Sequence, residues 1–194
     1  SHHGPRGSVY QAPIRRRPPV WVKARTWSEG QWSALAEARF LPTSMEHPLR
    51  ITEIMYHPIG GPEYEFLAVS NPAPFPVDLA WHRLRGVQYA FGVSDELLPG
   101  KTWFIASDKN PSAFRKRYPK MPVSGWFGGN LSNSGEPLGL DSPTGKTLLR
   151  FRYDDQAPWP RSAAGGGASL RNTRPLMPIG DPEHWMANPR PGRF

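Results

Sequence analysis

The chain has 194 residues, 38 % of them hydrophobic, which is enough for one good core but on the short side for two. Its 24 prolines and 19 glycines lie well above the ordinary combined share of roughly 12 % and argue against long helices. The sequence contains no apolar run near the ~20 residues that a membrane-spanning helix needs, and no signal segment opens it. The absence of cysteine excludes disulfides and thiol chemistry.

The net charge of +8 is concentrated near the N-terminus. Residues 1–50 hold eight basic and three acidic side chains, a net of +5, whereas the rest of the chain has a net of +3. The strongest basic feature is the run of Arg15, Arg16 and Arg17 in a proline-flanked arm. We interpret this arm as a solvated linker, with contact to a polyanion as the alternative.

The first residues, "SHHG", resemble the remnant of an expression tag, so residues 1–19 are assigned to a tag remnant and a basic, proline-rich arm. Residues 20–41 are predicted to form a β-hairpin, because two alternating strands flank a turn at "SEG". An isolated hairpin is marginal in water, so we expect it to pack on its own chain as a monomer, with pairing to a second copy in a dimer as the alternative. The proline-rich residues 42–48 are predicted to be a linker.

From Leu49 onward, short alternating strands follow one another and are separated by turn residues. One helical stretch interrupts them, with Asn110 as its N-cap and Pro111 at its first position. A "DSPTG" turn joins two later strands. This order predicts an all-β fold, an antiparallel β-sandwich of at least seven strands with one short helix, over residues 49–188, followed by a tail over residues 189–194.

The order of the motifs after residue 49 resembles that of the bacterial lamin tail domain. The motifs are "EIMYHP", "EFL", "DLAWHRL", "LLPG", "LSNSGEPLGL", "YDD", "PWP" and "GASL". The resemblance implies an immunoglobulin-like β-sandwich that serves as a binding and scaffolding module, without known catalysis, in large exported bacterial proteins. It supplies no site residues. The hairpin resembles, over about twenty residues, the last two strands of a fibronectin-like or chitobiase-like module that would precede this domain.

The stretch "EIMYHPIGGPEYEFLAV" brings several carboxylates close together in the sequence. Uniform strand alternation places Glu53 on the face of Ile51 and Met55, and Glu65 on the face of Leu67. If these faces point inward, both carboxylates are partly buried and need partners. We therefore interpret Glu53 and Glu65 as structural carboxylates. Their expected partners are the amides of the Gly60–Gly61 turn or the side chains of Arg83, Arg85, Arg150 and Arg152.

Two chemical uses of this stretch are alternatives. The first alternative is a divalent-cation site, with Glu53, Glu63 or Glu65 together with Asp154 or Asp155 as candidate ligands. Ca²⁺ would need six to eight oxygen ligands there. A hydrolytic centre is disfavoured, because His57 has no second histidine or cysteine at ligand spacing. The triple glycine at 165–167 is interpreted as a turn rather than a phosphate-binding loop, since no nucleotide motif surrounds it. We therefore assign no catalytic residue, cofactor or metal.

The sequence thus predicts a non-catalytic module of a larger exported bacterial protein, acting outside the cytoplasm. Its expected role is attachment to a surface, a partner protein or a neighbouring domain. The eight tryptophans keep open the binding of carbohydrate or another cell-surface polymer, and the positive charge keeps open weak, non-specific nucleic-acid binding. An exposed row of tryptophans would favour a sugar ligand; the candidates are Trp21, Trp27, Trp81, Trp126 and Trp185.

Overall fold

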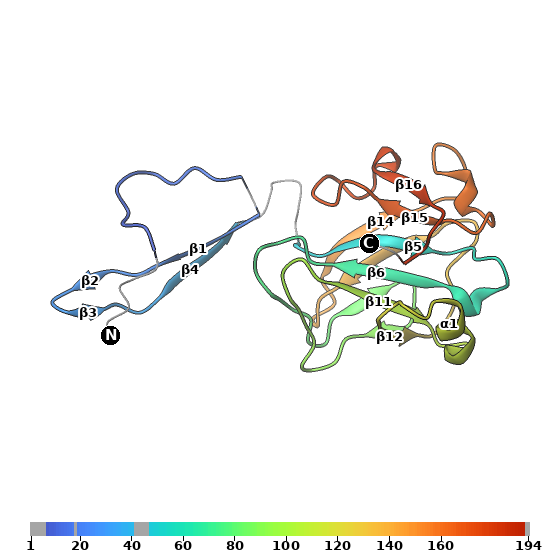
Figure 1. The fold of residues 1–194 in the computed structure, drawn as a ribbon, viewed down its shortest axis with the longest axis horizontal. Helices are drawn as coiled ribbons and strands as arrows, with labels where there is room; N and C mark the ends of the chain where they lie inside the picture. Colours follow the sequence, from blue (N-terminus) through green and yellow to red (C-terminus); the bar gives the residue numbers. More distant parts are fainter. Residues whose placement is uncertain (1–6, 18, 41–46, 193–194) are drawn as a thin grey trace.

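The computed structural model describes residues 7–17, 19–40 and 47–192. From residue 50 onward it consists of β-strands and short connections, with one α-helix, so the predicted all-β sandwich is confirmed. A six-stranded sheet packs against a four-stranded sheet (Figure 1). None of the helices in these described ranges is long and apolar enough to cross a membrane.

The six-stranded sheet is antiparallel except where β11 and β12 run parallel. From one edge to the other its strands are β12 (Val123–Phe127), β11 (Thr102–Ser107), β6 (Phe66–Ser70), β5 (Arg50–Met55), β15 (Ser169–Asn172) and β16 (Trp185–Asn188). Strand β5, which opens the domain, therefore lies beside β15, which comes from near its end.

The second sheet contains β14 (Thr147–Arg152), β13 (Pro137–Asp141), β8 (Arg83–Arg85) and β9 (Tyr89–Ala90), in that order. The predicted turn between β13 and β14 is closed by hydrogen bonds from the Ser142 amide to the Lys146 carbonyl and from the Gly145 amide to the Ser142 carbonyl. A further pair, β7 (Val77–Asp78) and β10 (Glu96–Leu97), and three 3₁₀ turns, η1 (Pro62–Tyr64), η2 (Arg161–Ala163) and η3 (Pro182–His184), complete the domain.

Two hydrophobic clusters lie on opposite faces of the six-stranded sheet. The main core lies between the two sheets and includes Leu67, Ile105 and Leu138, all fully buried. The second cluster lies on the outer face, where Phe66 meets Phe114 of α1 (Pro111–Arg117) edge to face. The predicted cap of this helix is confirmed, because the Asn110 side chain accepts a hydrogen bond from the Ala113 amide at 3.0 Å.

A β-bulge in β5 changes which of its side chains point inward. Ile51 pairs with Val69, but Glu53 pairs with Ala68, so Thr52 is an extra residue. As a result Ile51 and Ile54 both enter the main core, whereas Met55 joins the outer cluster. The expectation that Glu53 shares a face with Ile51 is therefore wrong, because the extra residue resets the alternation.

The hairpin predicted over residues 20–41 is observed up to Phe40. Strand β1 (Val20–Ala24) pairs with β4 (Ala36–Phe40), and β2 (Trp27–Ser28) pairs with β3 (Gln31–Trp32). At the tip, Glu29 and Gly30 have φ angles of 50° and 79°, the left-handed values that a tight hairpin turn requires. Residues 41–46, which include most of the predicted linker, lie outside the described residues, as do residues 1–6 of the predicted tag remnant and residues 193–194 of the tail.

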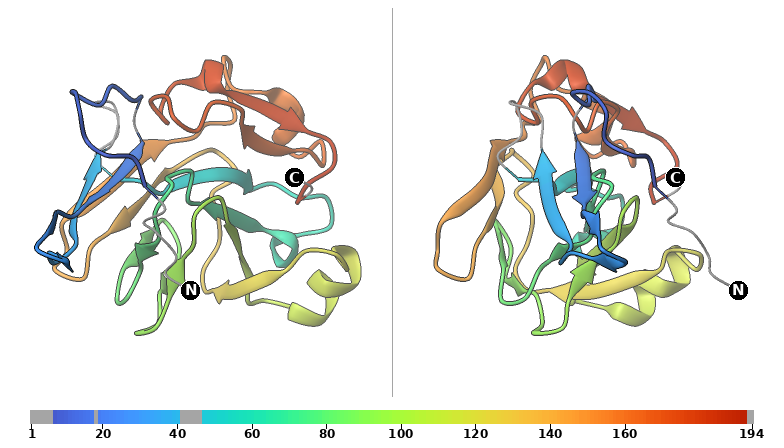
Figure 2. Two further views of the ribbon diagram at one scale, coloured as in Figure 1. Left: turned by 60° about the vertical axis from the view of Figure 1, so that its left-hand side comes forward. Right: turned by 90° about the vertical axis from the view of Figure 1, so that its left-hand side faces the viewer.

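The hairpin stands away from the end of the sandwich instead of lying along a sheet (Figures 1 and 2). Its base contacts the sandwich through Trp21, whose ring centroid lies 6.3 Å from that of Phe75, and through Arg39, which lies 5.1 Å from the Phe75 centroid. Strand β4 is exposed throughout. Within the described part of the chain, the expected packing of the hairpin on the sandwich is therefore confined to its base.

We predict that removing residues 1–46 leaves the sandwich folded. The contact at Phe75 is small, so the free energy of unfolding should change by about 1 kcal/mol. Urea denaturation followed by circular dichroism measures this change, and dispersed amide NMR signals confirm the native fold. An unfolded truncated protein would show that the hairpin is an integral part of the core.

Candidate functional site

The Glu53 carboxylate is fully buried on the outer face of the six-stranded sheet. Its Oε1 atom accepts three hydrogen bonds, from the Ser169 hydroxyl at 2.5 Å, the Asn188 side-chain amide at 2.9 Å and the Gly192 backbone amide at 2.9 Å. These donors come from β15, from β16 and from the segment that follows β16. Glu53 thus joins the centre of the sheet to the C-terminal segment.

Burial raises the pKa of Glu53, while the three hydrogen bonds and the nearby charge of Arg171 lower it. Its second oxygen, Oε2, is also buried and has no hydrogen-bond partner among the described residues. The structural role predicted for Glu53 fits this geometry. The partners differ from those expected, because Arg171, Ser169 and Asn188 are brought beside it by pairing of strands far apart in sequence.

Glu65 immediately precedes β6 and lines a polar cleft of about 540 Å³. Its Oε2 accepts a hydrogen bond from the Leu131 backbone amide at 2.8 Å. The pKa of this carboxyl is raised to about 7, mainly by burial and to a smaller extent by the neighbouring Glu136, while the Leu131 hydrogen bond and Lys109 act to lower it. Glu65 therefore holds the loop that carries Leu131, and its partner is again a backbone amide rather than an arginine.

The alternative of a metal site receives no support from the described residues, which contain no group of three or more histidine, cysteine or acidic side chains able to hold a metal ion. His57 lines the same cleft as Glu65. The Gly165–Gly167 segment, for which a phosphate-binding loop was the alternative, packs closely against neighbouring residues. A Cβ atom at Gly165 would lie 3.1 Å from the His57 ring, and one at Gly166 would lie 2.5 Å from the Ser162 carbonyl oxygen. Close packing accounts for these glycines together with the left-handed φ angles of Gly165 and Gly167, which are 86° and 82°.

The aromatic and basic candidates do not form one surface. Trp81 and Trp27 are exposed, but Trp185 is buried in the main core, so the five tryptophans form no exposed row. The hairpin tip instead carries Trp27 against Trp32, with ring centroids 4.9 Å apart. Arg15, Arg16 and Arg17 are all exposed in the arm, and their contact with a polyanion stays a prediction.

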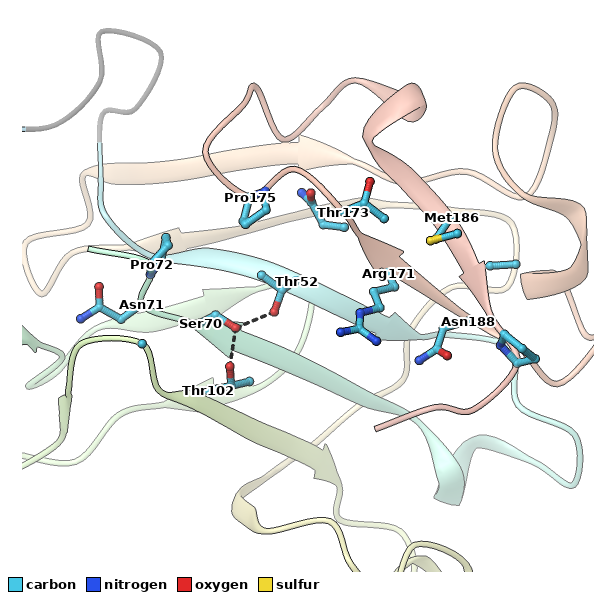
Figure 3. A pocket seen from close by; sticks show the side chains of 14 residues that line it. Thr52, Ser70, Asn71, Pro72, Thr102, Arg171, Thr173, Pro175, Met186 and Asn188 are labelled. Carbon is cyan, nitrogen blue, oxygen red and sulfur yellow. Dashed lines mark hydrogen bonds between the residues drawn. The ribbon is translucent and has the colours of Figure 1, made fainter. Parts of the chain in front are cut away.

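A groove of about 590 Å³ lies on the outer face of the six-stranded sheet, beyond the part that α1 covers (Figure 3). Its floor carries a row of three hydroxyls from neighbouring strands. Ser70 Oγ lies 2.6 Å from Thr52 Oγ1 and 2.7 Å from Thr102 Oγ1. The side chain of Arg171 lies between this row and Asn188 (Figure 3). We name this site the outer groove; its apolar walls come from Pro72, Pro175 and Met186.

Sequence reasoning missed this groove and also missed a buried arginine beside it. Arg50 is 3 % exposed and donates hydrogen bonds to the carbonyls of Pro175, His47 and Leu49. It fixes the start of β5 to the loop that forms one groove wall. Strand alternation could have placed Ser70 and Thr102 on one face, since each lies two positions from an outward-facing apolar residue. Alternation from Ile51 also places Thr52 on the face opposite the core, but it could not show that the strand order brings the three hydroxyls together.

No protein-family model matches the chain, and no curated protein or solved structure matches it either. Function is therefore inferred from the contacts, charge and exposure of the chain's own residues and from the motifs described above.

We predict that replacing Glu65 with glutamine removes a pH-dependent loss of stability. The pKa of Glu65 is raised from 4.5 to about 7 in the folded state, so the folded state binds the proton more tightly than the unfolded state. Stability from this group is present below pH 4.5 and is lost as the pH rises to about 7, by on the order of 3 kcal/mol. Glutamine keeps an acceptor for Leu131 without titrating.

The measurement is urea unfolding of the wild type and of Glu65→Gln between pH 4 and pH 8. Burial lowers the pKa of His47 to about 4, which acts in the opposite direction, so the difference between the two proteins isolates Glu65. The exposed Glu96→Gln variant is the matched control. A constant difference across this range would show that Glu65 does not titrate as proposed.

Proposed function

We propose that the protein is a non-catalytic binding module that attaches to a partner protein or a neighbouring domain through its N-terminal hairpin. The observation that carries this proposal is an uncovered apolar surface on the hairpin. Direct cross-strand pairs place six apolar side chains on one side of β1 and β4, because residues opposite each other in an antiparallel pair share a face. This hairpin face consists of Val20, Val22, Ala24, Ala36, Ala38 and Phe40.

The hairpin face has little cover from the described residues. Phe40 is 52 % exposed, and the alanines of β4 are exposed as well, while Val20 and Val22 are half-buried. A two-stranded hairpin is marginal in water without a hydrophobic partner. A contiguous apolar surface of this kind is typical of a protein-binding site.

The opposite side of the hairpin is polar and fixed by its own contacts. Lys23 lies 3.5 Å from the Trp21 ring centroid and 3.3 Å from the Glu37 carboxylate, and the Trp21 indole donates a hydrogen bond to Glu37 at 3.1 Å. Arg39 lies over the same ring at 5.0 Å. This side contacts Phe75 of the sandwich, so the hairpin face points to the other side.

The resemblance to the lamin tail domain supports the same proposal, since that family consists of binding and scaffolding modules. It also supports our proposal that the protein acts outside the cytoplasm as part of a larger exported protein. The structural use of Glu53 and Glu65 supports a role without catalysis. A sugar-binding role through tryptophans has less support, because Trp27 and Trp32 pack against each other and do not form an open platform.

We predict that a photo-reactive benzoylphenylalanine at position 40 cross-links to another protein in the host cells. The adduct should have one discrete mass and should disappear on protease treatment. Ala38→Lys should reduce it at least about tenfold, because binding would bury an unpaired ammonium group in the centre of the hairpin face.

The control places the same photo-reactive residue at position 93, where Val93 is 64 % exposed on the sandwich. This position should give no such adduct. Equal cross-linking at positions 40 and 93, or an adduct that Ala38→Lys leaves unchanged, would contradict attachment through the hairpin face. A protease-resistant polysaccharide adduct would favour the carbohydrate alternative.

A further inference from the structure

We propose that the free edge of strand β14 is a second binding site, which takes an extended acidic peptide as an added strand. Strand β14 lies at one edge of the four-stranded sheet (Figure 1). With six residues it is longer than any other edge strand of the two sheets, and among the described strands it pairs only with β13. The unpaired backbone groups of such an edge are a template for another strand.

The hydrogen bonds to β13 indicate which backbone groups of β14 point outward. Just beyond the strand, the Tyr153 amide donates to the Glu136 carbonyl. Hydrogen-bonded residues alternate along an antiparallel pair, so Phe151 and Leu149 also bond to β13. The N–H and C=O groups of Arg150 therefore point to the free edge, where no backbone group of the described residues bonds to them. An added strand can bond to both.

A groove of about 350 Å³ runs along this edge. Its lining includes the four consecutive residues 147–150 of β14 and the loop residues 178–180. Consecutive side chains of a strand point to opposite faces, so a groove that contacts four of them follows the edge rather than one face. Four residues of a strand are roughly 13 Å long, so a peptide of four or five residues matches the groove.

The charged side chains that line the groove are both arginines. Arg150 is exposed, whereas Arg50 is 3 % exposed and donates its hydrogen bonds to backbone carbonyls. No carboxylate of the described residues forms an ion pair with either of them. Burial lowers the pKa of Arg50 to about 10, so its guanidinium stays charged at neutral pH. A buried positive charge without a counter-ion favours an anionic ligand.

Arginines and bulges can also protect a sheet edge from unwanted pairing. In this sheet the register shift lies between Leu140 and Asp141 of β13, next to the turn, and residues 149–152 of β14 pair regularly. The regular part of the edge is therefore shaped for pairing. Its arginines repel a basic strand and attract an acidic one, so the edge selects its partner by charge.

The test is an NMR titration of the full chain with acetyl-Val-Glu-Val-Glu-Val-amide and with its counterpart acetyl-Val-Gln-Val-Gln-Val-amide. We expect the glutamate peptide to bind with a Kd of about 1 mM or tighter, and to shift the amides of β14 and of residues 179–180. The glutamine peptide should bind about fivefold to tenfold more weakly, because it loses the charge-assisted contacts with the two arginines.

Methylation of the peptide backbone tests strand addition itself. Alternate N–H groups of a strand point to opposite edges, and only one edge of the peptide can pair with β14. One peptide carries methyl groups on both glutamate nitrogens, and the other carries them on the last two valine nitrogens. We expect one of these peptides to bind at least about tenfold more weakly than the other, because it loses the hydrogen bonds to the edge.

Two variants separate the charge from the backbone. Arg150→Gln should weaken the glutamate peptide about threefold and leave the glutamine peptide unchanged. Arg150→Pro removes the outward N–H group, which an edge strand tolerates, and should weaken both peptides. If this variant does not fold, the methylated peptides still decide the question. The matched control is Arg83→Gln, an exposed arginine on β8 of the same sheet, and it should leave binding unchanged, as should Ala38→Lys on the hairpin.

Three results would overturn the proposal. The first is the absence of shifts in β14 at about 10 mM peptide, including the case in which only hairpin amides shift. The second is equal affinity for the glutamate and glutamine peptides. The third is equal affinity for the two methylated peptides, which would show that the ligand does not bind as a strand.

Discussion

Strand β5 contributes side chains to two hydrophobic clusters, and the extra residue at Thr52 allows it to do so. With uniform alternation, Ile51, Glu53 and Met55 would share one face. The bulge places Ile51 and Ile54 in the main core and leaves Met55 for the cluster beneath α1. Thr52, which follows the inward-facing Ile51, lies on the outer face beside Ser70 and starts the row on the floor of the outer groove. The core and the helix contact thus both depend on one inserted residue.

The bulge also decides what Glu53 does. It directs the carboxylate to the outer face, where Ser169, Asn188 and Gly192 donate hydrogen bonds to it. The chain after β16 is held against β5 by these bonds and by the contacts of Asn188 with the Arg190 backbone. Because Asn188 also lines the outer groove, the same network that closes the sheet shapes part of this groove.

Local patterns predicted the features that neighbouring residues determine. The N-cap at Asn110, the turn at Glu29 and Gly30 and the alternation in the hairpin each depend on a few adjacent residues. The partners of Glu53 could not be predicted, because they lie 116 to 139 residues away and their approach depends on strand order. The bulge was equally hidden, since nothing in the composition of β5 distinguishes an extra residue from a regular one. The outer groove likewise depends on strand order, which brings its lining residues together.

Glu53 joins the bulged strand to the neighbouring strands and to the C-terminal segment. The contribution of this structural anchor to the free energy of unfolding can be measured by urea unfolding at pH 7. The proteins to compare are the wild type, Glu53→Gln and Glu53→Ala. Glutamine keeps an acceptor for the three donors and should unfold at a urea concentration equal to or above that of the wild type. Alanine leaves three donors without an acceptor and should cost about 3 kcal/mol or more. An alanine variant as stable as the wild type would show that Glu53 does not anchor this segment.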